Sequence, residues 1–215
     1  MIEAVVFDLD GVLLDTEELW DEARREIAEE RGGRWRPEAQ RAMMGMSSPE
    51  WSRYMHDVIG VPDPPDRIAD EVVERMTELY RRQLPLVDGA VDAVRRIGRR
   101  WPLGIASSSN RQLIDLFLEL TGTGELFEAT VSSEEVAAGK PAPDVYLEAA
   151  ARLGVPPENC VAIEDSENGI RSAASAGMRV VAIPNRVFPP SVEALSLADV
   201  VLESVAQLTP EAIEG

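Results

Sequence analysis

Three side chains that enzymes often use are almost absent from this sequence. It contains one cysteine, Cys160, one histidine, His56, and one lysine, Lys140, and every other basic residue is an arginine. A single cysteine excludes a disulfide framework and a Cys-x-x-Cys metal site, and its place in an apolar run indicates a small core residue. Acid-base chemistry is therefore left to carboxylates, and Lys140 is either a special point charge or an ordinary surface residue.

Positive charge and long apolar runs are also scarce. The 215 residues carry 21 basic and 39 acidic side chains, and the net charge of −18 repels nucleic acid and anionic membranes. No segment approaches the roughly 20 apolar residues that span a bilayer, and the N-terminus has no basic leader. We expect a globular, cytoplasmic monomer whose partner is a small molecule, with no nucleic acid and no membrane involved.

The strongest local pattern is Val5-Val6-Phe7-Asp8-Leu9-Asp10-Gly11. The apolar run predicts a buried strand whose carboxyl end delivers Asp8 and Asp10 to a loop, where Gly11 lets the backbone turn sharply. In a parallel sheet, ligands bind at the carboxyl ends of the strands. An acidic strand end alone could be an ordinary turn, so this interpretation depends on matching residues elsewhere.

The rest of the chain divides into a helical block and an alternating block. Asp15 or Thr16 is expected to cap a first helix, and residues 37–84 show helical patterns only, broken by two segments rich in Gly and Pro. From Asp88 onward, helices alternate with short apolar runs, which predicts a parallel sheet covered on both faces. We predict an α/β fold, a doubly wound parallel sheet with an inserted all-helical cap. The core would comprise residues 1–15 and 86–215, and the cap residues 16–85.

Polar residues follow three further predicted strands: Ser107 and Ser108 after the second, Lys140 after the third, and Glu164 and Asp165 after the fourth. Because the carboxyl ends of parallel strands meet at one edge of a sheet, we expect these residues to lie near the two N-terminal aspartates. Carboxylates in one cleft repel each other unless a cation lies among them, and hard oxygen ligands suit Mg²⁺. We predict Asp8 and Asp165 as side-chain ligands, the Asp10 carbonyl as another, and Glu164 binding directly or through water.

The serines and the lysine predict a place for an anion. Hydroxyls and free backbone N–H groups at the start of a helix bind phosphate, and Lys140 adds a positive charge, although the serines could also be only a helix cap. With no thiol or histidine at the sheet edge, the nucleophile would be a carboxylate, which we assign as Asp8. Asp10 would protonate the leaving alkoxide and then deprotonate the attacking water.

Four segments resemble, in order, the four motifs of the haloacid-dehalogenase superfamily, in its subgroup of helical-cap phosphatases and β-phosphoglucomutases. They are Phe7-Asp8-Leu9-Asp10-Gly11-Val12, Ala106-Ser107-Ser108-Ser109, Gly139-Lys140-Pro141-Ala142-Pro143 and Ile163-Glu164-Asp165-Ser166. The resemblance implies a phosphoryl acceptor at Asp8 and an acid-base at Asp10. It also implies phosphate ligands at Ser107 and Lys140, Mg²⁺ among Asp8, Asp10 and Asp165 with Glu164 assisting, and a cis peptide before Pro141. The second acid, Asp10, favours phosphoryl transfer over dehalogenation.

Substrate choice is predicted to lie in the cap, which would close over the site. The loop around Gly45 and Ser47 is a candidate substrate-binding element, with ordinary packing between cap helices as the alternative. Trp20 stands where β-phosphoglucomutases would have a histidine, and Ser48 stands where they would have an arginine that grips a second phosphate. The residues Trp20, Trp51, Arg41, Arg53 and His56 are further candidates for substrate contact or for structural roles.

Three functions follow from these patterns. The first is a Mg²⁺-dependent phosphatase that hydrolyses a small phosphorylated metabolite, a sugar phosphate, through an aspartyl-phosphate. The second is a β-phosphoglucomutase-like hexose-phosphate mutase. The third is a phosphate-binding regulatory module without turnover. Release of phosphate from a panel of esters separates the first from the other two.

Overall fold

The computed structural model describes residues 1–215, and its strands form one parallel sheet in the order β3-β2-β1-β4-β5-β6. The strands are β1 (Ala4–Phe7), β2 (Leu103–Ser107), β3 (Phe127–Ser132), β4 (Cys160–Glu164), β5 (Arg179–Ala182) and β6 (Val200–Val201). Every pairing is parallel, and β1 lies between β2 and β4. The predicted α/β fold with a doubly wound parallel sheet is confirmed.

Ten α-helices accompany the sheet: α1 (Glu17–Glu30), α2 (Ala39–Met43), α3 (Ser48–Tyr54), α4 (Pro65–Arg82), α5 (Ala90–Ile97), α6 (Arg111–Thr121), α7 (Asp144–Leu153), α8 (Glu167–Ser175), α9 (Val192–Leu195) and α10 (Pro210–Glu214). A π-helical turn, Met55–Ile59, follows α3, and short 3₁₀ turns cover Gly124–Leu126, Ser133–Glu135, Pro157–Asn159 and Val205–Gln207. No helix is both long enough and apolar enough to cross a bilayer.

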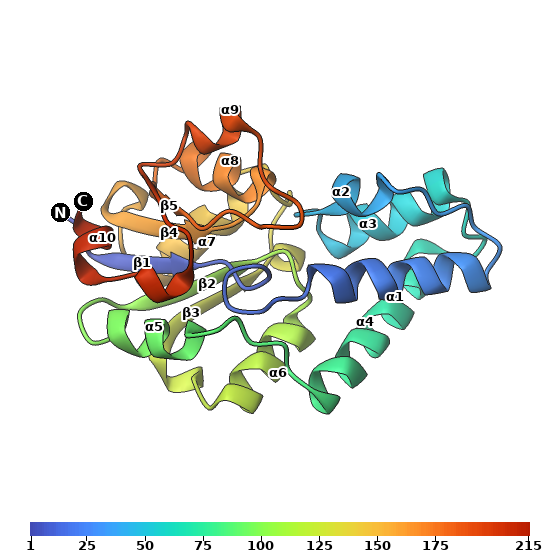
Figure 1. Ribbon diagram of the computed structural model, residues 1–215, viewed down its shortest axis with the longest axis horizontal. Coiled ribbons are helices and arrows are strands. Elements are labelled where there is room, and N and C mark those ends of the chain that lie inside the picture. The colour runs from blue at the N-terminus through green and yellow to red at the C-terminus, as the bar shows by residue number, and fades with distance from the viewer.

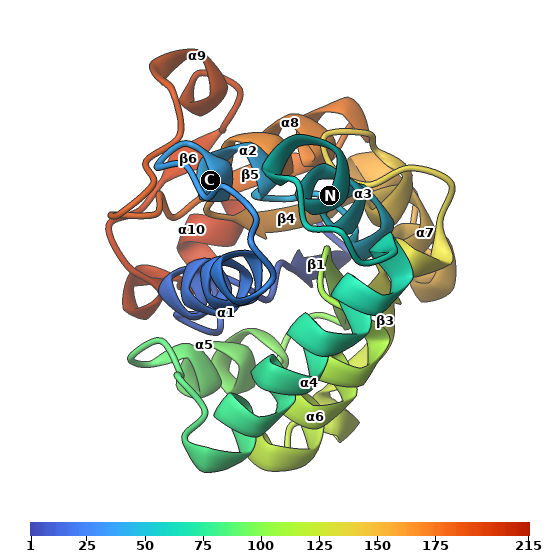
Figure 2. The ribbon, with the colours of Figure 1, turned by 90° about the vertical axis from the view of Figure 1, so that its right-hand side faces the viewer.

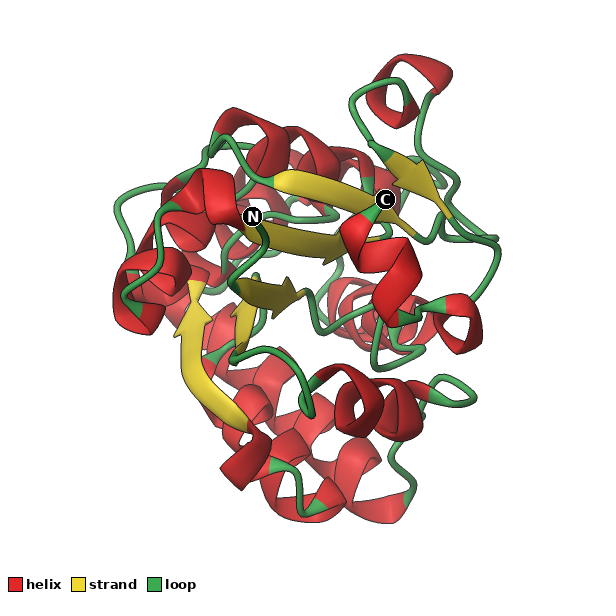
Figure 3. Cartoon of the chain, turned by 90° about the vertical axis from the view of Figure 1, so that its left-hand side faces the viewer, coloured by secondary structure: helices red, strands yellow, loops and turns green.

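The two faces of the sheet are covered by different helices, as Figure 3 shows with the strands in yellow between red helices. Successive side chains of β1 point to opposite faces of the sheet, as neighbouring side chains of any strand do. Val5 and Phe7 pack with residues of α5 and α6, whereas Ala4 and Val6 pack with residues of α7 and α8. Half of the 16 buried residues on the second face are alanines, so small side chains fill much of the space between the sheet and these two helices.

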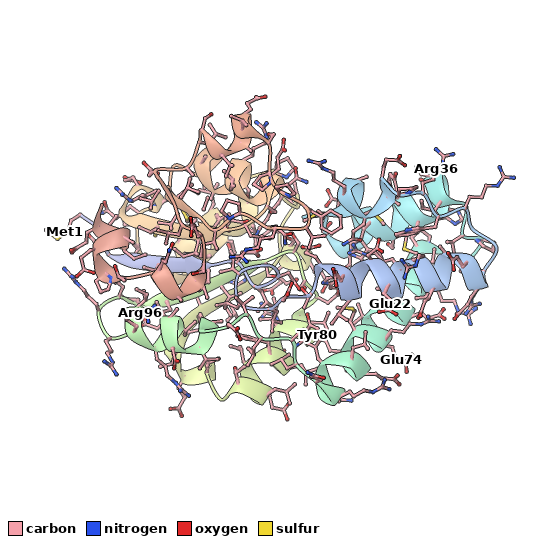
Figure 4. All side chains as sticks on the ribbon, in the orientation of Figure 1. Met1, Glu22, Arg36, Glu74, Tyr80 and Arg96 are labelled. Atoms are coloured by element: carbon pink, nitrogen blue, oxygen red, sulfur yellow. The ribbon has the colours of Figure 1, made fainter.

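The helices of the predicted cap lie together at one end of the molecule, opposite both chain termini (Figure 1). Figure 2 looks onto this end, with α1 and α4 toward the viewer. Figure 4 labels Glu22 of α1 and Arg36 at this end, and Tyr80 of α4 near the middle of the molecule. One apolar cluster of 40 buried residues runs from these helices into the face of the sheet that carries α5 and α6. The division into residues 16–85 and the remainder stays a prediction.

The cap expected at the start of the first helix needs correction. Thr16 is the residue before α1, but its hydroxyl makes no cap and donates instead to Asp10 Oδ1. β3 begins at Phe127, and the exposed Glu128 interrupts its apolar pattern without ending the pairing with β2. The Phe127 ring packs edge-on against Phe7, with ring centroids 6.3 Å apart.

Candidate active site

The carboxyl ends of β1 and β4 bring three acidic side chains into one buried cluster. The Asp8 backbone N–H still donates to Ile163 of β4, at 2.9 Å, so Asp8 lies beside the end of that strand. Carboxylate oxygens of Asp8, Glu164 and Asp165 all lie within 4.8 Å of one another. Asp8 is 6% exposed, and the other two side chains are fully buried. Burying like charges this close is costly unless positive charge compensates them.

Lys140 supplies part of that compensation. It is 3% exposed, and its Nζ lies 2.8 Å from Asp8 Oδ1 and 2.6 Å from Glu164 Oε1. Burial alone would lower the pKa of Lys140, but the two carboxylates outweigh it and raise the pKa above its usual value. The peptide bond between Lys140 and Pro141 is cis, as the resemblance implies.

Tyr146 of α7 completes the surroundings of the lysine. Its ring lies under Lys140, with Nζ 4.9 Å from the centroid, and its hydroxyl donates to Glu164 Oε1 at 2.8 Å. No sequence motif marks Tyr146, although it lies on α7, the helix that follows the Lys140 loop. Its contacts fix Glu164, because the same carboxylate oxygen accepts from both Lys140 and Tyr146.

The acidic cluster fits a divalent cation. Glu164 Oε2 accepts from the backbone N–H groups of Asp165 and Ser166, whereas Asp165 Oδ1 is buried without any hydrogen-bond partner. Burial, followed by neighbouring carboxylates, raises the pKa of Asp165, and burial also raises the pKa of Asp8 against the opposing effect of Lys140. An unpaired buried oxygen and acids that resist ionisation both indicate missing positive charge, and an all-oxygen donor set suits Mg²⁺.

Gly11 makes room for this arrangement. Its φ is +84°, and a Cβ built at this position would lie only 2.0 Å from Asp165 Oδ2. The left-handed turn and the close approach both require glycine. Asp165 Oδ2 is held in place by the Asn185 side chain, which donates to it at 3.0 Å.

Asp10 lies in the same cavity but is held by a separate set of donors. Its Oδ1 accepts from the Thr16 hydroxyl, from Trp20 Nε1 at 3.1 Å and from the Tyr80 hydroxyl at 3.4 Å, and its Oδ2 accepts from the Ser109 hydroxyl at 2.5 Å. Three of these donors come from the predicted cap and one from the loop after β2. The orientation of the Asp10 carboxyl therefore depends on both parts of the chain.

The three serines at the end of β2 and just after it have different positions. Ser107 is fully buried, and its hydroxyl oxygen accepts from the backbone N–H of Ser109 at 3.0 Å. Ser108 and Ser109 line the cavity, and Ser108 donates to the carbonyl of Gly45 at 2.8 Å. Ser109 was not singled out from the sequence, because nothing in a run of three serines tells which hydroxyl reaches the second aspartate.

The cavity lies between the sheet edge and the helices of the predicted cap. Its volume is about 40 Å³, and its lining includes Asp8, Asp10, Lys140 and Asp165 on one side and Gly45 and Met46 on the other. That volume holds a few water molecules.

The loop from Met44 to Ser47 closes one side of the cavity and is hydrogen-bonded to residues of the α/β part of the chain. The Asn168 side chain donates to the Met44 carbonyl at 2.8 Å, in addition to the bond from Ser108 to Gly45. Gly45 has a φ of +77°, and a Cβ there would lie 2.9 Å from Asn168. Ser47 lies outside the lining and forms a capping box with Glu50 at the start of α3.

The remaining candidates of the predicted cap lie in other surroundings. His56 Nδ1 is 2.9 Å from the carbonyls of Val61 and Asp63, within the helical end. Ser48 donates to the Asn110 side chain at 2.9 Å, and Arg41 donates to the carbonyl of Pro189 at 3.4 Å. Arg53 lines a neighbouring surface groove, which Met46 and Lys140 also line. None of these four side chains lines the cavity, whereas Trp20 and Trp51 do.

Sequence patterns did not predict one polar group of the cavity wall. Glu17 and Arg24 of α1 line the cavity, and Gln40 of α2 bonds to both. The signal that could have found Arg24 is its position four residues after Trp20, on the apolar stripe of the first helix.

The chain is similar to known proteins over most of its length. The haloacid dehalogenase-like hydrolase family matches residues 2–177. The chain is 36% identical to a probable pseudouridine-5′-phosphatase of Drosophila melanogaster, over 96% of this chain and 91% of that protein. It is 32% identical to hexitol phosphatase B of Escherichia coli K12, over 100% of this chain and 97% of that protein. The crystal structure of CbbY from Rhodobacter sphaeroides, in complex with phosphate, superimposes with a TM-score of 0.88 at 31% identity and full coverage of both chains.

Proposed function

The chain belongs to the haloacid dehalogenase-like hydrolases, and on that premise we propose that it is a Mg²⁺-dependent phosphatase of a small sugar phosphate. The observation that carries the proposal is the buried cluster of Asp8, Lys140, Glu164 and Asp165, which opens on one cavity together with Asp10. The relatives named phosphatases, among them hexitol phosphatase B, support the same reaction class.

Asp8 is the proposed nucleophile. A carboxylate oxygen forms a bond to phosphorus while the bond between phosphorus and the ester oxygen breaks, which yields an aspartyl-phosphate and an alkoxide. Lys140 Nζ, 2.8 Å from Asp8 Oδ1, lowers the repulsion between the carboxylate and the phosphoryl oxygens. Water then attacks phosphorus, which releases inorganic phosphate and regenerates the carboxylate.

Asp10 is the proposed acid-base. It gives a proton to the leaving alkoxide and takes one from the attacking water in the second step. Ser109 donates to one oxygen of its carboxyl and Trp20 to the other, so the group is oriented before the substrate reacts.

Asp8 and Asp165 would hold Mg²⁺, with Glu164 beside them and the Asp10 backbone carbonyl as a further ligand. When bound, Mg²⁺ supplies positive charge that offsets the carboxylates and the phosphoryl oxygens. Residues 16–85 act as a cap that covers the site and excludes water. Lys140 with Ser108 would bind the phosphate, and Gly45 lies in the loop that covers it. Ser107 and Ser47 support these loops, because the hydroxyl of each bonds within its own segment.

The mutase alternative is weaker on this structure. A mutase must grip a bisphosphate at both ends, but Ser48 bonds to Asn110 outside the cavity, and Trp20 donates to Asp10. The cations among the lining residues are Lys140 and Arg24, and Arg24 lies beside the carboxyl of Glu17.

Phosphate release from a panel of sugar phosphates, with Mg²⁺ and with EDTA, tests the proposal. We expect release that needs Mg²⁺ and falls by more than about 10⁴-fold in Asp8→Asn. Release by Asp8→Asn equal to that of the unaltered protein would reject the proposed nucleophile. Conversion of β-glucose 1-phosphate to the 6-phosphate with little free phosphate would favour the mutase, and binding without turnover would favour a regulatory module.

A further inference from the structure

Arg24 is a buried cation for which the phosphoryl chemistry has no use. It is 5% exposed, and its guanidinium carbon lies 4.6 Å from the ring centroid of Trp20 and 4.8 Å from that of Trp51. Its Nη1 donates to Gln40 Oε1 at 3.1 Å, but its Nε is buried with no hydrogen-bond partner. Such an unpaired donor in a cavity wall is costly unless a ligand accepts from it.

Glu17 provides an acceptor beside this donor. Gln40 bridges the two residues, since its Nε2 donates to Glu17 Oε2 at 3.1 Å while its Oε1 accepts from Arg24. Burial and then the charge of Asp10 raise the pKa of Glu17 to about 7, against the opposing effect of Arg24. Donor and acceptor groups thus lie together at the end of the cavity formed by α1 and α2.

The charges at this end indicate what kind of group it accepts. A second phosphate or a carboxylate would meet Arg24 but would also meet Glu17 and Asp10, which repel anions. A hydroxyl group accepts from Arg24 and donates to Glu17 at the same time, so it satisfies both. Met43, Met44 and Met46 also line the cavity. Their unbranched side chains can change rotamer to admit a carbon chain.

We propose that Arg24 and Glu17, held by Gln40, form a subsite that binds hydroxyl groups of the substrate far from its phosphate. This inference rests on the proposed function, and it narrows the substrate to polyhydroxy monophosphates. Bisphosphates and esters of plain alkyl chains fit the subsite poorly.

Two esters with six carbons test the subsite: hexitol 6-phosphate, which carries hydroxyls along the chain, and hexyl phosphate, which has none. In Arg24→Met, we expect kcat/KM for hexitol 6-phosphate to fall about 100-fold and kcat/KM for hexyl phosphate to change less than about threefold. The matched control is Arg25→Met, because Arg25 is the next residue of the same helix and pairs with Asp21 at the surface. It should leave both values unchanged.

Arg24→Lys separates recognition from packing. Lysine keeps a cation between the two indole rings but lacks the fixed fork of donors, so the melting temperature should stay near that of the unaltered protein while selectivity for the hexitol ester is lost. The subsite would be overturned if Arg24→Met lowered kcat/KM equally for both esters. It would also be overturned if Arg24→Lys kept the full preference for the hexitol ester over the hexyl ester. If Arg24→Met lowered kcat/KM more for a sugar bisphosphate than for the monophosphate, the subsite would also be overturned, because Arg24 would then bind an anion.

Binding measurements keep this test independent of catalysis. By titration calorimetry in Asp8→Asn, adding Arg24→Met should weaken the binding of hexitol 6-phosphate at least about tenfold and leave that of hexyl phosphate nearly unchanged. If the unaltered protein releases phosphate from no ester, the proposed function fails, and the calorimetric comparison still decides the subsite. Equal binding of the hexitol ester with and without Arg24 would reject it.

Discussion

Lys140 shows how one side chain holds a charged cluster together. Its ammonium group lies between Asp8 and Glu164, and all three side chains are buried. Removing one partner of a buried ion pair leaves uncompensated charge, which costs about 3–5 kcal/mol. Lys140→Met should therefore lower the free energy of unfolding by this amount, measured with urea in EDTA.

The control for this measurement is an exposed ion pair. Arg25 and Asp21 lie 3.2 Å apart on α1, with side chains 42% and 26% exposed. Such a pair contributes less than about 1 kcal/mol, so Arg25→Met should change the free energy of unfolding little. If Lys140→Met and Arg25→Met lowered the free energy of unfolding equally, the burial of Lys140 would not explain its contribution to stability.

Glu17 predicts a pH dependence of stability. Its pKa rises from 4.5 to about 7 on folding, because of burial and the charge of Asp10, although Arg24 and the bond from Gln40 oppose the rise. The folded protein keeps the proton up to about pH 7, whereas the unfolded chain loses it near pH 4.5. The stabilisation is therefore complete below pH 4.5 and is lost as the pH rises through 7.

The variant Glu17→Gln isolates this contribution, since glutamine does not titrate. Between pH 4.5 and 8, the free energy of unfolding of the unaltered protein should fall by roughly 3 kcal/mol relative to the variant. Urea unfolding of both proteins at the two pH values measures the difference. A difference that stays constant over this range would show that Glu17 keeps an ordinary pKa.

At the scale of elements, the turn after β1 controls the geometry of the acidic cluster. Gly11 and Gly60 have nearly equal φ values, +84° and +85°, but a Cβ at Gly11 would meet Asp165, whereas nothing lies within 4 Å of one at Gly60. In both alanine variants, the left-handed backbone conformation of the alanine lowers the free energy of unfolding by about 1 kcal/mol. Only Gly11→Ala displaces Asp165, so we expect the Mg²⁺ concentration for half-maximal phosphate release to rise at least about tenfold in this variant alone.

Titration of phosphate release with Mg²⁺ measures this effect, and urea unfolding measures the shared cost. If Gly60→Ala raised the Mg²⁺ requirement as much as Gly11→Ala, the backbone conformation rather than the contact with Asp165 would be responsible.

The elements explain why much of the site could be predicted from the sequence. Apolar runs that end in polar residues locate the carboxyl ends of β1 and β4, and the topology of a parallel sheet then brings Asp8 and Asp165 together. The contacts of Arg24 and Gln40 could not be predicted in this way, because they depend on how α1 and α2 pack. No periodic pattern specifies the angle between two short helices.

The hydrogen-bond partners of the serines at the end of β2 and after it, and of Thr16, could not be predicted either, because they also depend on packing. A hydroxyl can reach several partners within one loop, and its choice depends on distances of less than an ångström. Thr16 bonds to Asp10 rather than to its own helix, and Ser109 rather than Ser107 reaches that carboxyl. Local sequence patterns describe which groups can form hydrogen bonds, but not which partner is nearest after packing.

At the scale of the whole molecule, Mg²⁺ should stabilise the fold. A ligand that binds the folded state alone raises the free energy of unfolding by about 2.7 kcal/mol at 100 times its dissociation constant. The unpaired oxygen of Asp165 and the clustered acids predict this gain, because the cation offsets their repulsion. The melting temperature should rise with Mg²⁺ and return to its starting value with excess EDTA.

Asp165→Asn should show a much smaller rise, and NaCl at matched ionic strength should give none. A rise of the same size in NaCl would mean that general screening of the net charge of −18, rather than a specific site, stabilises the protein.

The two connections between the sheet and residues 16–85 lie side by side. The backbone N–H of Asp15 donates to the carbonyl of Pro85 at 2.8 Å, and that of Val87 donates to the carbonyl of Leu13 at 3.1 Å. A segment whose ends already touch can be replaced by a longer or shorter one without stretching the strands on which it is mounted. During evolution, such a chain could exchange the helices of residues 16–85, which we propose select the substrate, and retain unaltered the strand ends that carry Asp8 and Asp165.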